Sequence, residues 1–405
     1  MSDLERFREE VRTFLEKETP VGIRGAVLAS DQAYWGGRKP ELPHPDSKRY
    51  CEVMASRGYT APTWPKEYGG GGLDAAQAKV LDQELAKLRL PIPLTGFGLA
   101  MIGPTLLQFG THEQKQEHVP KIARGEIRWV QGYSEPGAGS DLAAVATSAV
   151  EDGDELVLNG QKIWTSYGDK GDWMFALVRT DPKVKKQQGI TFVLFDMAQP
   201  GVEVRPIKLI SGASPFCETF LSDARAKKSN IIAGMNNGWT VAKGLLGHER
   251  NMIGSVFGSG GGRSSADAAK ARKNPLVDLA RTHVGEDNGR IADPVLRDRI
   301  TQMGMDHRAF MLTVQRSADN AKAGRPPGPE SSIFKVFGTE LNQRREELML
   351  SIRGPQALGW EGEGFAAEEL AQTRAWLRSR GNTIEGGTSE VQLNIIAKRV
   401  LDLPD

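Results

Sequence analysis

The pattern of apolar residues changes twice along this chain, and the two changes limit the folds that it can adopt. Up to about Gly125 the apolar side chains recur at helical spacing, interrupted by a turn-rich stretch at residues 62–72. Between Ile127 and Gly238 the chain contains short runs rich in β-branched and aromatic residues, separated by turn signals. Helical spacing then returns. The sequence therefore predicts an α+β fold with its strands in the middle of the chain.

Short strands without intervening helices are typical of a small β barrel or β sandwich. We therefore expect an N-terminal helical domain at residues 1–126, a middle β-barrel or β-sandwich domain at 127–238 and a C-terminal helical domain at 239–405.

Local signals predict where some elements begin and end. Ser2 and Glu5 can form a capping box for the first helix, which we expect to end before Pro20. The pair Asn159-Gly160 predicts a hairpin turn. We expect the last helix to begin near Ser389.

Charge and cysteine content exclude several classes of protein. The 52 basic and 51 acidic residues give a net charge of +1, so no overall field favours nucleic acid or an anionic membrane. Cys51 and Cys217 have neither a disulfide pattern nor metal-ligand spacing, which favours a reducing compartment. No stretch approaches the roughly 18 apolar residues of a membrane span, and no targeting segment is visible. We expect a cytoplasmic protein without a metal, a nucleic-acid partner or a membrane span.

Three motifs carry candidate chemistry. In the run GYSEPGAGSD at residues 132–141, small residues let backbone N–H groups approach a ligand, although a plain surface turn is the alternative. In KIWTS at residues 162–166, the indole of Trp164 can stack on a flat ring, although a tryptophan on a strand is more often part of the core. Residues 386–389, Gly-Gly-Thr-Ser, open a predicted helix whose N-terminus can hold a diphosphate.

These motifs, with the tail RGNTIEGGTSEVQLNII at residues 380–396, resemble the signatures of the acyl-CoA dehydrogenase family, flavoenzymes that desaturate an acyl thioester between its α and β carbons. The resemblance covers nearly the whole chain. It implies FAD as cofactor, acyl-CoA as substrate, an electron-transfer flavoprotein as acceptor, a C-terminal four-helix bundle, a homo- or hetero-oligomer and a role in fatty-acid or steroid side-chain β-oxidation. The cofactor contacts that it implies are Tyr133, Ser134, Gly139, Ser140, Trp164, Ser166, Gln356, Gly359, Thr388 and Glu390. Within this set, Ser140 would also contact the CoA side of the substrate.

The position of the catalytic base separates two branches of the family. Removing the α proton requires a carboxylate in a dry pocket. One branch carries it in the tail, where this chain has Gly386. The other branch takes it from a Glu-Arg pair on the first C-terminal helix, which Glu249-Arg250 matches. A Glu-Arg pair on a helix is usually a solvated face, but its apolar neighbours favour a partly buried one. We predict Glu249 as the base, Arg250 as a group that orients it or the substrate, Glu385 as the reserve base, and the Gly386 N–H as a donor to the thioester oxygen.

Two departures from the family pattern keep other functions open. Trp360 replaces a glycine beside Gln356, and the glycine-rich stretch 257–263 replaces an element that contacts a neighbouring subunit's FAD. We interpret that stretch as a kink or a widened pocket wall for a bulky acyl group, and the connection that follows resembles forms active on steroid side chains. The alternatives to a dehydrogenase are a non-catalytic subunit that completes a partner's FAD site and a flavin oxidase or monooxygenase on the same fold.

Overall fold

The computed structural model describes residues 2–26, 33–247, 274–325 and 328–404. These residues form two compact units. The first contains residues 2–207 and 215–247, and the second contains residues 208–214 and 274–404.

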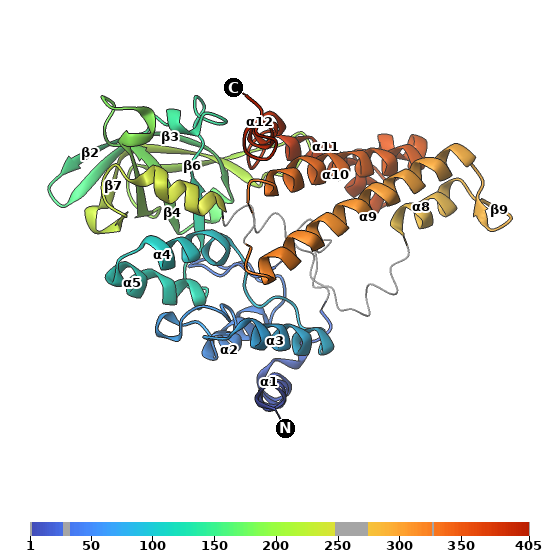
Figure 1. Cartoon of the computed structure of the whole chain (residues 1–405), viewed down its shortest axis with the longest axis horizontal. Helices are drawn as coiled ribbons and strands as arrows, with labels where there is room; N and C mark the ends of the chain where they lie inside the picture. Colours follow the sequence, from blue (N-terminus) through green and yellow to red (C-terminus); the bar gives the residue numbers. More distant parts are fainter. Residues whose placement is uncertain (1, 27–32, 248–273, 326–327, 405) are drawn as a thin grey trace. The chain divides into compact units, whose positions relative to one another are not determined.

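The N-terminal part of the first unit is helical, as the spacing of apolar residues predicts. Its capping box is present: the Glu5 N–H donates to Ser2 Oγ at 3.3 Å, and the Ser2 N–H donates to Glu5 Oε2 at 2.7 Å. The first helix ends at Glu18, before Pro20, as expected. The helices of this part, which Figure 1 colours blue to teal, are α1 (Asp3–Glu18), α2 (Ser47–Ser56), α3 (Ala75–Lys87), a π turn at Gly98–Ile102, α4 (Gly103–Phe109) and α5 (His112–Ala123).

The rest of the first unit is built on one eight-stranded sheet, which confirms the predicted β-rich middle. Its strand order is β6-β7-β3-β2-β4-β5-β8, and β1 pairs in parallel with β4. The strands are β1 (Trp129–Gly132), β2 (Ser148–Asp152), β3 (Glu155–Ser166), β4 (Trp173–Arg179), β5 (Ile190–Asp196), β6 (Val202–Ile207), β7 (Phe216–Lys227) and β8 (Ile231–Ile232).

The predicted hairpin turn at Asn159-Gly160 is wrong, because both residues lie inside β3. The turn that joins β2 to β3 lies instead at Gly153, which has a φ of 57°. At Gly160 the ladder shifts register, and an added Cβ would lie 2.6 Å from Thr147 Oγ1. The glycine therefore allows close approach at a bulge rather than a chain reversal.

A shared core joins the helices of the first unit to its sheet. Ile102 of the π turn, Leu106 of α4 and Ile122 of α5 pack in one cluster with Phe175 and Phe192 of the sheet. Residues 238–247 are helical, and their buried apolar side chains belong to the same cluster. The domain boundary that we placed at residue 238 stays a prediction.

The second unit is a set of helices arranged around α10, which contacts each of the others. A small core that includes Leu276, Ile300, Leu348 and Ile352 holds three of them together. Its elements, orange to red in Figure 1, are α8 (Pro275–His283), a short hairpin of β9 (Glu286–Asp287) and β10 (Arg290–Ile291), α9 (Pro294–Lys322), α10 (Ser331–Arg353), α11 (Ala367–Ser379) and α12 (Ser389–Arg399). The last helix begins at Ser389, as predicted. Of the helices described in the two units, none has the length and apolar character needed to cross a membrane.

Candidate functional site

The loop at residues 132–141 follows β1 and presents open backbone. Glu135 and Ala138 exchange two backbone hydrogen bonds, of 3.1 and 3.0 Å, and so form a tight turn. A Cβ added to Gly137 or Gly139 would meet nothing within 4 Å in the described chain, so internal packing does not require glycine at either position. This is the geometry in which a ligand can approach a backbone closely.

Trp164 lies on a bulge of β3 and points away from the core. Lys162 pairs with Thr219 and Thr165 with Cys217, so β3 has one extra residue between these pairs. Trp164 has a φ of 60°, which is strained for a bulky side chain, and it is 52% exposed. Its indole has an edge contact with Phe216, with ring centroids 6.0 Å apart. The alternative that Trp164 is a core residue is therefore wrong.

The structure joins the loop to this bulge. The Ile163 N–H donates to the Ser134 carbonyl oxygen at 2.9 Å, so two motifs far apart in sequence lie side by side. Ser134 is half-buried, whereas Ser140 is exposed. Tyr133 points the other way: its ring is buried against Phe175 and Phe192, so it can offer a ligand on the loop only its backbone.

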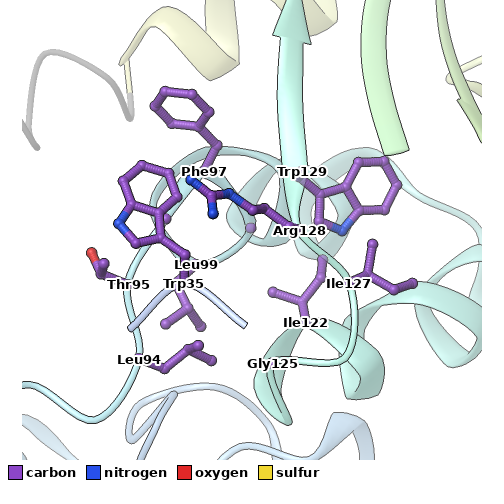
Figure 2. A pocket seen from close by; sticks show the side chains of 12 residues that line it. Trp35, Leu94, Thr95, Phe97, Leu99, Ile122, Gly125, Ile127, Arg128 and Trp129 are labelled. Carbon is purple, nitrogen blue, oxygen red and sulfur yellow. The ribbon is translucent and has the colours of Figure 1, made fainter. Parts of the chain in front are cut away.

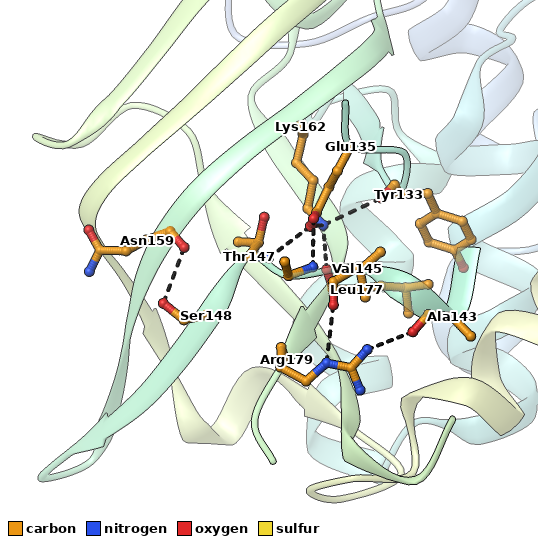
Figure 3. A network of polar contacts seen from close by, with 11 residues as sticks. Tyr133, Glu135, Ala143, Val145, Thr147, Ser148, Asn159, Lys162, Leu177 and Arg179 are labelled. Carbon is orange, nitrogen blue, oxygen red and sulfur yellow. Dashed lines mark hydrogen bonds and ion pairs between the residues drawn. The ribbon is translucent and has the colours of Figure 1, made fainter. Parts of the chain in front are cut away.

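A buried ion pair that the sequence did not reveal lies beneath the loop and the bulge (Figure 3). Lys162 Nζ is 2.6 Å from Glu135 Oε1, and both side chains are buried. Burial lowers the pKa of Lys162 to about 8, although the charge of Glu135 opposes this shift. Burial acts to raise the pKa of Glu135, but the charge and hydrogen bond of Lys162 outweigh it and lower that pKa. One signal could have revealed the pair: Lys162 falls on the same alternating positions of β3 as the buried Leu156 and Leu158.

A second polar group missed by the sequence analysis is Arg128, which lines a small cavity in the first unit (Figure 2). Its guanidinium lies 4.8 Å from the Trp35 ring centroid and 5.4 Å from that of Tyr167, next to Ser166 in sequence. Burial lowers the pKa of Arg128, against the attraction of Glu41. The cavity volume is about 10 Å³, which corresponds to about one water molecule.

In the second unit, the tail motif forms the N-terminus of α12. Thr388 is the N-cap, and its Oγ1 accepts from the Val391 N–H at 3.3 Å. Gly386 and Gly387 have φ values of 65° and 88°, a conformation that favours glycine and would strain a glutamate. Hydrogen bonds from its own backbone N–H and from Thr388 lower the pKa of Glu390.

Unsatisfied polar atoms lie on α12 and on the neighbouring α10. Ser389 Oγ, Gln392 Oε1 and Lys335 Nζ are buried, and within the described residues none has a hydrogen-bond partner. Burial lowers the pKa of Lys335, and this shift is opposed by the charges of Glu385 and Glu390. Buried polar groups normally find partners, so these three atoms are candidate contacts for a polar ligand.

Glu385, the reserve base, is engaged by its neighbours. Arg378 Nη2 lies 2.6 Å from Glu385 Oε2, and Asn382 Nδ2 donates to Oε1 at 2.7 Å. The Glu385 side chain is 45% exposed. A wet carboxylate with both oxygens engaged is the opposite of the dry base that the chemistry requires.

Gln356 and Gly359 have surroundings that need no ligand. Gln356 belongs to the exposed 3₁₀ turn Gly354–Leu358. A Cβ on Gly359 would lie 2.4 Å from the Phe365 ring, so packing alone explains that glycine. The glycine-rich stretch 257–263, Glu249 and Arg250 lie outside the described residues. Among the residues that are described, no cluster of His, Cys, Asp and Glu could hold a metal ion.

Family models match three stretches of the chain. The acyl-CoA dehydrogenase family models match residues 1–126 (N-terminal domain), 131–241 (middle domain) and 236–401 (C-terminal domain). The chain is 35% identical over 405 residues to acyl-CoA dehydrogenase IpdE1 of Mycobacterium tuberculosis, covering 100% of this chain and 99% of that protein.

Solved structures agree with these sequence matches. The Tcur3481-Tcur3483 steroid ACAD matches with a TM-score of 0.72 and 27% identity, over 99% of this chain and 97% of that one. The ChsE4-ChsE5 complex of Mycobacterium tuberculosis matches with a TM-score of 0.70 and 27% identity, over 100% and 98% of the two chains.

Proposed function

Because the chain belongs to the acyl-CoA dehydrogenase family, and is therefore an oxidoreductase acting on acyl-CoA, we propose that it binds FAD beside the loop 132–141 and Trp164. With this cofactor it desaturates a bulky acyl-CoA between the α and β carbons of the acyl group. The family is one of flavoproteins, and FAD binding by this chain is the finer part of the proposal. When bound, the flavin accepts the hydride that leaves the β carbon.

The observation that carries this proposal is the exposure of Trp164. The Trp164 indole is 52% exposed and lies on a strained bulge. The neighbouring Ile163 N–H bonds this bulge to the open loop at residues 132–141. The indole therefore offers a flat apolar surface beside free backbone. Strained residues of this kind cluster at ligand sites. In this arrangement Trp164 would stack on the flavin ring, and the hydroxyls of Ser134 and Ser166 would bond its polar edge. Gly139 would leave room for the ligand, Ser140 would contact the CoA side, and Tyr133 would take part through its backbone.

The N-terminus of α12, taken within the second unit alone, is a further candidate contact for the cofactor. Thr388 and Glu390 would contact FAD, and the positive end of the helix dipole favours a diphosphate. Support comes from the unsatisfied buried atoms of Ser389, Gln392 and Lys335 in this region. The contacts of Gln356 and Gly359 with a neighbouring subunit's FAD remain predictions that rest on the motif alone.

The proposed base is Glu249, with Arg250 as a positioning residue. Two observations on the tail support this choice indirectly. The tail position that carries the base in the other branch is Gly386, whose positive φ suits glycine, and Glu385 is occupied by Arg378 and Asn382. The Gly386 N–H would still be able to stabilise the oxyanion that develops on the thioester oxygen.

We propose a steroid-derived or similarly bulky acyl group, because one matched structure is described as a steroid ACAD. An electron-transfer flavoprotein is the proposed electron acceptor. The matched ChsE4-ChsE5 structure is a complex, and we propose a heteromeric assembly for this chain as well. The cytoplasmic location stays a prediction.

A second candidate function is a non-catalytic subunit, which the glycine at position 386 favours. Flavin reduction by a panel of acyl-CoA thioesters without oxygen, on the wild type and on Glu249→Gln, separates the two functions. Proton abstraction by Glu249 predicts that Glu249→Gln keeps its FAD but loses reduction by at least about 100-fold. Glu385→Gln is the matched control and should reduce flavin at nearly the wild-type rate. Normal reduction in Glu249→Gln would reject Glu249 as the base, and a wild type that no thioester reduces would favour the non-catalytic role.

A further inference from the structure

We propose that the buried Lys162–Glu135 ion pair is a positioning device that locks the loop 132–141 to the β3 bulge and so fixes Trp164 and Ser134 in register for the cofactor. This inference rests on the proposed FAD site and names residues that touch neither the cofactor nor the substrate. It concerns only residues of the first unit that the structure describes.

The pair connects three segments of the unit. Lys162 Nζ donates to Glu135 Oε1 and to the Leu177 carbonyl oxygen of β4, both at 2.6 Å. Glu135 in turn accepts the N–H groups of Ala146 at 2.6 Å and Thr147 at 3.0 Å. Figure 3 shows these bonds converging on the two side chains. Glu135 therefore bonds the loop to β3 and to the segment before β2, and Lys162 bonds the same site to β4.

The pair also lies next to the strained residue. In a regular strand, residues 162 and 164 would point to the same face. Here Lys162 is 0% exposed and Trp164 is 52% exposed, because the extra residue of the bulge turns Trp164 outward. A strained residue persists only where its surroundings fix it. Lys162 fixes the bulge from the inside, and the Ile163 N–H fixes it from the loop side.

A buried ion pair of this kind is better explained by positioning than by stability. Removing two charges from water is unfavourable, and replacing such a pair with apolar residues of similar volume is often neutral or stabilising. The network is well satisfied, since Lys162 Nζ has a third acceptor, the Tyr133 carbonyl oxygen at 3.4 Å. Such a network specifies one arrangement of the segments that it joins.

The test compares the wild-type holoenzyme with Glu135→Gln and with the double variant Lys162→Met/Glu135→Gln. The double variant leaves no unpaired buried charge, and the one carbonyl oxygen of the introduced glutamine replaces one of the two carboxylate oxygens that accept the Ala146 and Thr147 N–H groups. Asp152→Asn is the matched control, because it breaks the Arg225–Asp152 pair (2.5 Å) of the same sheet at the exposed β2–β3 turn. For each protein the rate of FAD release after dilution is measured by flavin fluorescence, and the thermal unfolding midpoint is measured alongside. Quenching of Trp164 by the flavin is obtained as the difference from Trp164→Phe in the same background.

We expect FAD release to be at least about tenfold faster in both pair variants and Trp164 quenching to fall, with Asp152→Asn unchanged. Pair variants that fold, hold FAD as the wild type does and keep the same quenching would overturn the positioning role and leave the proposed FAD site intact. Pair variants with a lower unfolding midpoint but wild-type release and quenching would likewise overturn it, since the pair would then act only on stability. A wild type that binds no FAD would instead reject the proposed function itself.

Discussion

The Ile163 N–H donates to the Ser134 carbonyl oxygen at 2.9 Å, and this bond joins two motifs that are far apart in the sequence. It places an exposed indole beside a loop in which Gly137 and Gly139 have no neighbour within 4 Å of an added Cβ in the described chain. Side chains on this surface contribute to ligand binding but little to packing. Substitutions there should therefore change ligand affinity without changing the free energy of unfolding.

Trp164→Gly should weaken FAD binding without destabilising the fold. Glycine adopts a positive φ freely, so the substitution relieves backbone strain. This gain should offset two losses, the greater conformational entropy of glycine in the unfolded chain and the contacts of a half-exposed indole. The free energy of unfolding should therefore change by no more than about 1 kcal/mol. Trp129→Ala is the comparison, since Trp129 is 1% exposed and its loss should be destabilising by about 3–5 kcal/mol. Denaturant unfolding and FAD titration measure both effects. Wild-type FAD affinity in Trp164→Gly would contradict a stacking role.

Gly139→Ala and Gly160→Ala should have opposite effects. At Gly139 an added methyl meets open space, so stability should change by less than about 0.5 kcal/mol while binding of FAD or acyl-CoA weakens. At Gly160 it would lie 2.6 Å from Thr147 Oγ1, so the fold should be destabilised by more than about 1 kcal/mol. Thermal unfolding and ligand titration of the two variants give the answer. Unaltered binding in Gly139→Ala would mean that the loop is only a surface turn.

Glu84 should make the stability of the N-terminal helices depend on pH. Burial would raise the pKa of Glu84, but hydrogen bonds from Arg12, Lys87 and Arg8 outweigh it and lower the pKa to about 2. Because the folded-state pKa lies below the unfolded value of 4.5, the unfolded chain binds more protons in this range. The contribution of Glu84 is therefore complete above pH 4.5 and is lost as the pH falls towards 2.

We expect Glu84→Gln to lower the free energy of unfolding by about 2–3 kcal/mol near neutral pH and by clearly less at about pH 3. Glu16→Gln, on the exposed face of α1, is the control and should have little effect at either pH. Denaturant titrations at the two pH values provide the measurement. An effect of Glu84→Gln that is equal at both would show that charge pairing is not its cause.

Much of the fold could be predicted from local sequence, because helix and strand periodicity and the Ser2 cap depend on neighbouring residues. The turn at Asn159-Gly160 was predicted wrongly because Gly160 is needed against Thr147, a contact that only the folded sheet creates. The real turn contains Asp152-Gly153, a signal of the same kind.

The candidate site shows the same limit. The motifs indicated the loop, Trp164 and the tail, because each carries its glycines, indole or cap in consecutive residues. The Lys162–Glu135 pair depends on strand pairing between distant segments, and a lysine in a strand ordinarily indicates an exposed face. Its burial follows from the tertiary structure.

The most direct test of the whole account is the colour of the purified protein when an acyl-CoA is added without oxygen. A steroid side-chain acyl-CoA should bleach the bound flavin within the turnover time, and the same acid without CoA should leave it oxidised. A protein that holds FAD but keeps its colour with the steroid side-chain acyl-CoA and with every saturated acyl-CoA in a chain-length series would contradict dehydrogenation as its activity.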